Sequence, residues 1–132
     1  MANKGCCGWG SAIERRERPM GHGKDILDGL KEPTRALRGE IPGVFDAYGA
    51  MGKAVMVDGA LDAKTKELIA LAIAVSKQCD GCIASHARSA ALRGATAEEV
   101  AEALGVVVMM NGGPGTVHGP RAYDAFVEFS SR

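Results

Sequence analysis

Apolar residues along this chain recur with the spacing of helices, and short breaker sequences separate the segments that carry them. The strongest segment spans residues 61–78, where eight consecutive apolar residues run from Leu68 to Val75 and Asp62 can cap the start. A helix that is apolar on all sides is buried on most of them. In a chain this small, such a helix indicates a subunit interface as well as a core.

The rest of the chain continues the same helical pattern. Thr96 and Glu99 have the spacing of a capping box and open a helix through about Asn111, which carries the apolar run VVVMM at residues 106–110. The other predicted helices are 25–39, which Pro33 interrupts, 44–56, 79–94, which Gly94 closes, and 116–130, which follows a Gly-Gly-Pro-Gly turn at 112–115. We therefore predict an all-α, single-domain helical bundle that assembles through buried apolar helices.

The N-terminal residues do not share this pattern. Residues 1–24 are rich in glycine and charge and have no apolar period, so we predict a flexible N-terminal arm followed by one helical domain over residues 25–132. The adjacent Cys6 and Cys7 are either two free thiols on this arm or a second redox centre or intermolecular link.

Composition and charge exclude several classes of function. The chain has 16 Lys and Arg against 16 Asp and Glu, so it lacks the basic surface expected of a protein that binds nucleic acid or an anionic membrane. No stretch reaches the ~18 apolar residues of a membrane span, and the N-terminus lacks the apolar stretch of a secretory signal. We expect a cytoplasmic, reducing location, where closely spaced cysteines are more often catalytic or metal-binding than structural.

The candidate chemistry begins with Cys79 and Cys82, which are three residues apart in the first turn of a predicted helix. This spacing puts both side chains on one face and within disulfide reach. The unpaired N–H groups and the positive end of the helix dipole stabilise a thiolate there. One thiolate can attack a substrate and its neighbour can then form a disulfide. The alternatives are half of a zinc site or two small buried side chains.

His86 and Glu67 are the candidate proton carriers. His86 lies four residues after Cys82 and seven after Cys79, so the three side chains share one stripe of the helix, and an imidazole there can exchange protons with a thiol. Glu67 lies near the start of the most apolar helix. It is either a first-turn carboxylate favoured by the helix dipole or a partly desolvated proton shuttle.

These residues together resemble a known family. Their spacing resembles that of the alkylhydroperoxidase D-like branch of the carboxymuconolactone decarboxylase superfamily. In this pattern Glu67 is followed after eleven residues by Cys79-x-x-Cys82, after three more by His86, and later by Gly94-Ala95-Thr96. The resemblance covers roughly residues 40–130. It implies an all-helical fold that forms homo-oligomers, often trimers or hexamers.

The resemblance also implies a cysteine-based peroxidase, an oxidoreductase that needs no organic or metal cofactor. Cys82 would be the peroxidatic nucleophile, Cys79 the resolving cysteine, and Glu67 and His86 the proton relay; the partners would be a hydroperoxide substrate and a dithiol electron donor. The alternatives are a zinc-binding protein that uses these four side chains as ligands, and a non-catalytic redox sensor of the same fold.

Two positions depart from the family pattern. Some of the family's peroxidases carry a histidine directly before the second cysteine, where this chain has Gly81, so the relay would be shorter or use water. Many relatives have a tyrosine after the Gly-Gly-Pro turn, where His118 stands here; it is either another imidazole near the site or a surface-loop histidine. The family's decarboxylases lack the cysteine pair, and its presence argues against lactone decarboxylation.

Overall fold

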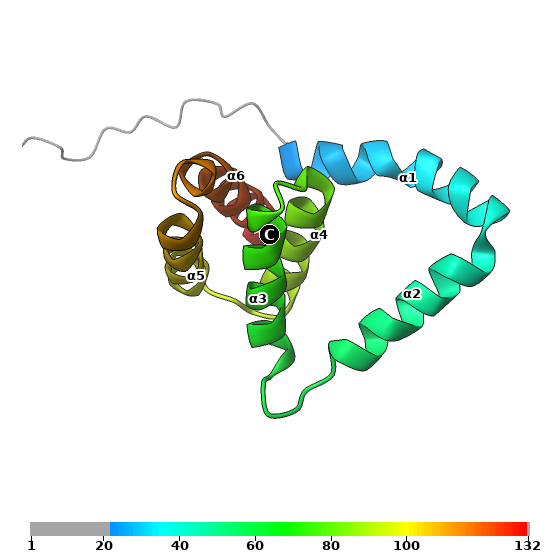
Figure 1. Cartoon of the computed structure of the whole chain (residues 1–132), viewed down its shortest axis with the longest axis horizontal. Helices are drawn as coiled ribbons and strands as arrows, with labels where there is room; N and C mark the ends of the chain where they lie inside the picture. Colours follow the sequence, from blue (N-terminus) through cyan, green and yellow to red (C-terminus); the bar gives the residue numbers. More distant parts are fainter. Residues whose placement is uncertain (1–21, 132) are drawn as a thin grey trace, which may run out of the picture.

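The structure, a computed structural model, describes residues 22–131, which form six α-helices and no strand (Figure 1). In chain order the helices are α1 (His22–Glu40), α2 (Pro42–Val55), α3 (Ala63–Ser76), α4 (Asp80–Leu92), α5 (Ala97–Asn111) and α6 (Gly113–Ser130). The prediction of an all-α fold is confirmed. Within this part of the chain, no helix combines the length and the apolar character needed to cross a bilayer.

The hydrophobic core lies among α3, α4, α5 and α6. Its largest fully buried side chains are Phe126, Leu71, Val75 and Val100. Alanines fill much of the remaining space between these helices, at positions 74, 87, 90, 122 and 125. Small side chains let helix axes approach closely, which suits a chain with only 5% aromatic residues.

Local interactions define the ends of these helices as the sequence predicts. The Asp62 carboxylate accepts the backbone N–H three residues on, at 2.7 Å, and caps α3. Thr96 and Glu99 form the reciprocal hydrogen bonds of a capping box at the start of α5. Gly94, at a φ of +78°, ends α4 in the left-handed conformation that glycine adopts without strain.

Helix α1 differs from its prediction. It continues through Pro33, which we expected to interrupt it. Proline removes one hydrogen bond inside a helix, but residues 28–40 are all exposed, so water can satisfy the carbonyl left without a donor. Helix α1 also begins at His22, three residues before the predicted helix start at residue 25. The rest of the predicted N-terminal arm, residues 1–21 with Cys6 and Cys7, lies outside the described residues.

The predicted turn at 112–115 is also wrong. Helix α6 already begins at Gly113, and Gly112 alone, at a φ of +60°, makes the junction with α5. Pro114 occupies the first turn of α6, where its missing N–H would have no intrahelical partner in any case. The glycines and proline that predict a turn therefore form a helix start.

Gly115 lies directly against the backbone of α5. A Cβ added there would lie 2.9 Å from Val108 Cα and 3.0 Å from Val107 O, and neither backbone atom can move freely. We expect Gly115→Ala to lower the free energy of unfolding by about 1–3 kcal/mol through overpacking. Gly113→Ala is the control, because its Cβ would meet nothing within 4 Å. Thermal unfolding of both variants checks this, and equal melting temperatures would contradict it.

Helices α1 and α2 project from the bundle as a V-shaped arm (Figure 1). The start of α1 packs on α4 and α6, whereas α2 packs on α1 and is joined to α3 at its end, where Lys66 Nζ donates to Val55 O at 2.8 Å. No residue of α2 is buried. This arm is absent from the sequence prediction, which treated all six helices as parts of one bundle.

Candidate functional site

The turn between α3 and α4 fixes the position of the first cysteine. Gln78 adopts a φ of +55°, in the left-handed region that glycine usually occupies at a helix end. The N–H groups of Gln78 and Cys79 donate to Val75 O at 3.0 Å and Ala74 O at 3.2 Å, which is the Schellman pattern. Cys79 is thus hydrogen-bonded to the last turn of α3 and is also the N-cap residue of α4.

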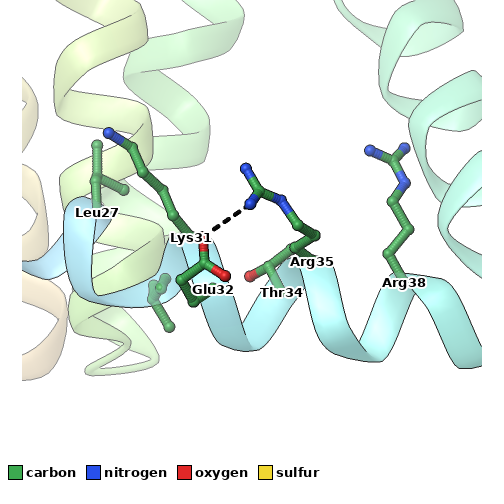
Figure 2. A pocket seen from close by; sticks show the side chains of 7 residues that line it. Leu27, Lys31, Glu32, Thr34, Arg35 and Arg38 are labelled. Atoms are coloured by element: carbon green, nitrogen blue, oxygen red, sulfur yellow. Dashed lines mark hydrogen bonds and ion pairs between the residues drawn. The ribbon is translucent and has the colours of Figure 1, made fainter.

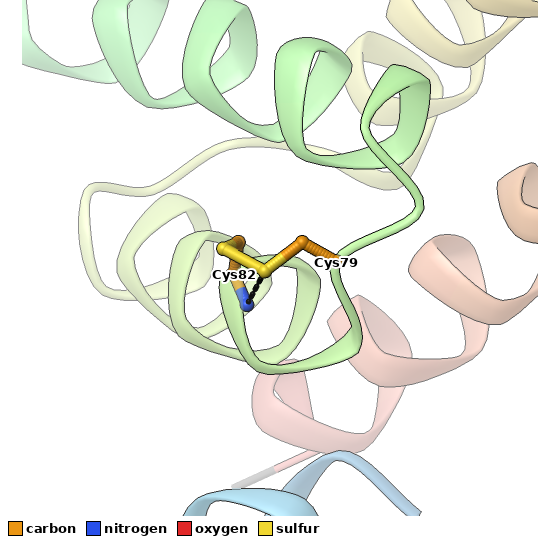
Figure 3. The surroundings of a disulfide bond; sticks show 2 residues. All are labelled: Cys79 and Cys82. Atoms are coloured by element: carbon orange, nitrogen blue, oxygen red, sulfur yellow. Dashed lines mark hydrogen bonds between the residues drawn. A yellow bond between two sulfur atoms is a disulfide. The ribbon is translucent and has the colours of Figure 1, made fainter. Parts of the chain in front are cut away.

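Cys79 and Cys82 are joined by a disulfide bond at the N-terminal end of α4, with their Cα atoms 5.2 Å apart (Figure 3). The Cys79 sulfur also accepts a hydrogen bond from the backbone N–H of Cys82, at 3.3 Å. Cys82 is exposed and Cys79 is half-buried. A reagent in solution therefore reaches the Cys82 sulfur more readily, and the helix terminus stabilises a thiolate on Cys79.

Glu67 and His86 are hydrogen-bonded to each other across α3 and α4. Glu67 Oε2 lies 2.8 Å from His86 Nδ1. Glu67 is only 6% exposed, whereas the His86 side chain keeps 31% of its surface in contact with solvent. The Nε2 atom of His86 has no hydrogen-bonding partner among the described residues. A buried carboxylate on one imidazole nitrogen orients the ring and leaves the other nitrogen to exchange protons.

Leu30 of α1 covers the space between the two cysteines. A Cβ added at Gly81 would lie 3.0 Å from Leu30 Cδ1, so the arm passes directly over the Cys-x-x-Cys turn. The space beside Gly81, where some family peroxidases place a histidine, thus holds an aliphatic side chain. Sequence reasoning missed Leu30, because nothing in its local pattern signals contact with a turn fifty residues away.

The four side chains of the zinc alternative are paired with one another in the structure. Cys79 and Cys82 are bonded to each other, and Glu67 is hydrogen-bonded to His86. No group of three or more His, Cys, Asp and Glu side chains in residues 22–131 is arranged to hold a metal ion. His118 lies within α6 and is half-buried, with no hydrogen-bonding partner for its Nδ1 among those residues, so it is not a surface-loop histidine.

An open pocket follows α1 near the site but has little net charge. Its lining side chains are Leu27, Leu30, Lys31, Glu32, Thr34, Arg35 and Arg38 (Figure 2). Lys31 pairs with Asp28 at 2.6 Å, Arg35 with Glu32 at 2.9 Å, and Arg38 with Asp46 at 3.6 Å. Because acidic neighbours compensate these cations, the pocket has no evident preference for an anionic ligand.

The fold and site define an all-helical protein with a cysteine pair at a helix start and a buried glutamate–histidine pair beside it. Residues 42–125 match the model of the carboxymuconolactone decarboxylase family. The chain belongs to that family, which confirms the superfamily predicted from the motif.

One of the known proteins similar to this chain has a crystal structure. It is the apo form of lpg0406, a carboxymuconolactone decarboxylase family protein from Legionella pneumophila, with 41% identity, a TM-score of 0.79, and coverage of 83% of this chain and 97% of that one. An uncharacterised protein of Cupriavidus necator is 41% identical over 77% of this chain and 93% of its own length. An uncharacterised protein from the cox locus of Paracoccus denitrificans is 44% identical over 60% of this chain and 71% of its own length.

Proposed function

We propose that this protein is a cytoplasmic thiol-dependent peroxidase and disulfide oxidoreductase, in which Cys82 attacks a hydroperoxide and Cys79 resolves the product. The observation that carries the proposal is the cysteine pair at the start of α4, one turn from the Glu67–His86 pair. Membership of a family that includes peroxidases agrees with it.

The reaction takes three steps. The Cys82 thiolate attacks the terminal oxygen of the hydroperoxide; the O–O bond breaks, Cys82 becomes a sulfenic acid, and the departing alkoxide takes up a proton to form an alcohol. The Cys79 thiol then condenses with the sulfenic acid, which forms the disulfide and releases water. A dithiol donor restores both thiols by exchange and leaves as its own disulfide.

The two cysteines suit different parts of this cycle. Cys82 is the more exposed residue of the pair, which favours attack on its sulfur by a peroxide or a donor thiolate. When the donor attacks Cys82, Cys79 is the leaving group, and the Cys82 N–H that already points at its sulfur stabilises the departing thiolate. A better-stabilised leaving thiolate departs faster.

His86 and Glu67 handle the protons in this proposal. Cys82 must lose a proton before it attacks, and the alkoxide must gain one. His86 is one helical turn from Cys82, and its half-exposed ring can exchange protons at Nε2 while Nδ1 stays on Glu67. The buried carboxylate would stabilise the ring when it carries the extra proton.

Thiol titration tests the reaction class. We expect the reduced protein, given one equivalent of an organic hydroperoxide, to lose two thiols per chain within the mixing time of a manual assay. Cys6→Ser/Cys7→Ser is the control, because it leaves only the proposed pair and should lose the same two thiols. Loss no faster than in a Cys79→Ser/Cys82→Ser protein would contradict the proposal.

A redox sensor of the same fold is the second candidate. The observation that favours it is the contact of Leu30 with Gly81, since a change in the Cys-x-x-Cys turn would reach the arm through α1. Steady-state peroxide consumption with a dithiol donor separates the two candidates. Repeated turnover supports the peroxidase, and a single slow oxidation supports the sensor.

A further inference from the structure

The first turn of α4 carries an acidic side chain, Asp80, between the two cysteines. Asp80 directly follows the N-cap residue Cys79 and precedes Cys82 by two positions. It is exposed, and its carboxylate has no hydrogen-bonding or ion-pairing partner among residues 22–131. A full negative charge that no bound cation compensates therefore lies on the same turn as the disulfide.

This charge opposes the effect of the helix terminus on the cysteines. The N–H groups at the start of a helix stabilise a thiolate, and the Cys82 N–H donates to the Cys79 sulfur at 3.3 Å. A carboxylate one or two residues away repels the same thiolate and any anion that approaches it. Two unit charges about 6 Å apart in water-like surroundings change a rate or an equilibrium by about threefold, so the effect is large enough to measure.

Charged groups on the helices around the cysteine turn differ in how far they are compensated. On α1, which passes over the turn, Lys31 is paired with Asp28 at 2.6 Å. Between α3 and α4, the buried Glu67 is hydrogen-bonded to His86 at 2.8 Å. Lys77, the C-cap residue of α3, is exposed and has no ion-pairing partner among residues 22–131. Lys77 therefore acts against the carboxylate between the cysteines, and its effect must be measured beside it.

We propose that Asp80 is a specificity-determining residue of the cysteine pair, which disfavours anionic substrates and electron donors relative to neutral or cationic ones. A reagent must bring its reacting atom to the Cys82 sulfur, and a negative charge beside that atom then lies close to the Asp80 carboxylate. The same repulsion lowers the fraction of cysteine that is thiolate. For the natural reaction this inference rests on the proposed function, but its test uses alkylating reagents, so a failure of either can be told from a failure of the other.

Two alkylating reagents of similar size provide the test, because iodoacetamide is neutral and iodoacetate is an anion. Each forms a bond from its CH2 carbon to the thiolate sulfur and releases iodide. A Cys6→Ser/Cys7→Ser/Cys79→Ser background leaves Cys82 as the only thiol, and serine is a favoured N-cap residue, so α4 keeps its start. The ratio of the two rate constants does not depend on the thiolate fraction, because both reagents react with the same thiolate.

We expect Asp80→Asn to lower the rate ratio of iodoacetamide to iodoacetate by about threefold at low salt. At about 1 M salt the change should be smaller, because dissolved ions screen exposed charges. Asp80→Glu keeps the charge and should keep the ratio. Glu98→Gln is the matched control, because it removes a first-turn carboxylate from α5, a helix start without a cysteine, and should also keep the ratio. Circular dichroism should show that all the variants remain helical.

Three results would overturn the proposal. The first is an unchanged ratio in Asp80→Asn at low salt, and the second is an equal fall in Glu98→Gln. The third is a larger change in Lys77→Gln than in Asp80→Asn, which would assign the discrimination to the cation of α3. A fall confined to Asp80→Asn in a protein that fails to consume peroxide would remove the proposed function and still support the charge preference of the cysteine pair.

Discussion

Replacing Cys82 with serine is expected to reduce donor-dependent peroxide consumption to the rate of the blank without protein. Serine cannot supply a thiolate, and Cys79, which is half-buried and is the N-cap of α4, is less accessible to a peroxide. Cys79→Ser is expected to behave differently. It should consume one equivalent of peroxide and stop, because Cys82 can be oxidised to the sulfenic acid but has no partner for the disulfide.

Trapping of the sulfenic acid with a carbon nucleophile checks these roles. Mass spectrometry should locate the adduct on Cys82 in the Cys79→Ser protein and find none on Cys79 in the Cys82→Ser protein. Both variants belong in a Cys6→Ser/Cys7→Ser background, so that no other thiol contributes. The N-cap position stabilises a thiolate on Cys79, whereas exposure favours attack at Cys82. An adduct on Cys79 alone would mean that thiolate stability decides and that the roles are reversed.

The sequence predicts α3, α4 and α5 well because each has a local signal at one of its ends. Asp62 caps α3, Thr96 opens α5, and Gly94 ends α4, and the structure contains all three interactions. The spacing also places Cys79 and Cys82 within one helical turn and at disulfide distance. Local chemistry of this kind can be read from spacing alone.

Features that depend on contacts between distant segments could not be predicted. The cost of Pro33 inside a helix is smaller where water can satisfy the freed carbonyl, and exposure is a property of the folded chain. Gln78 at a helix end carries no glycine signal, yet it makes the turn that positions Cys79. Two hydrogen bonds that no local pattern indicates hold the V-shaped arm of α1 and α2. The N–H of Gly23 donates to Glu128, and Lys66 Nζ donates to the carbonyl oxygen at the end of α2.

The redox site and the arm are physically connected. Leu30 lies on α1 between the anchor at Gly23 and the start of α2, and it covers Gly81 between the cysteines. Leu30 would therefore limit the approach of a substrate to the cysteine turn on the side that faces α1.

Replacing Glu67 with glutamine is expected to slow peroxide-driven thiol oxidation by at least about tenfold, since general acid–base contributions typically run about 10²–10⁴-fold. Glutamine keeps the size of the side chain, and its carbonyl oxygen can still accept a hydrogen bond from His86 Nδ1. It removes the negative charge that stabilises the ring when His86 takes up the cysteine proton. The variant should therefore fold and assemble normally yet react slowly.

A purely structural role for Glu67 leads to a different result. Glu67 lies beyond the first turn of α3, so the interpretation as a first-turn dipole partner is wrong. If the carboxylate only holds His86 through its hydrogen bond, Glu67→Gln should lower stability by about 0.5–1.5 kcal/mol and leave the oxidation rate nearly unchanged. Glu99→Gln is the control: its hydrogen bond from Lys64 holds the pKa of Glu99 below the ordinary value, so it stays ionised near neutral pH, and it lies outside the proposed relay. Melting temperature and oxidation rate, measured on the same preparations across about pH 6 to 9, decide between the two roles. A Glu67→Gln protein that oxidises at the wild-type rate throughout this range would remove Glu67 from the relay, and His86 would then exchange protons with water alone.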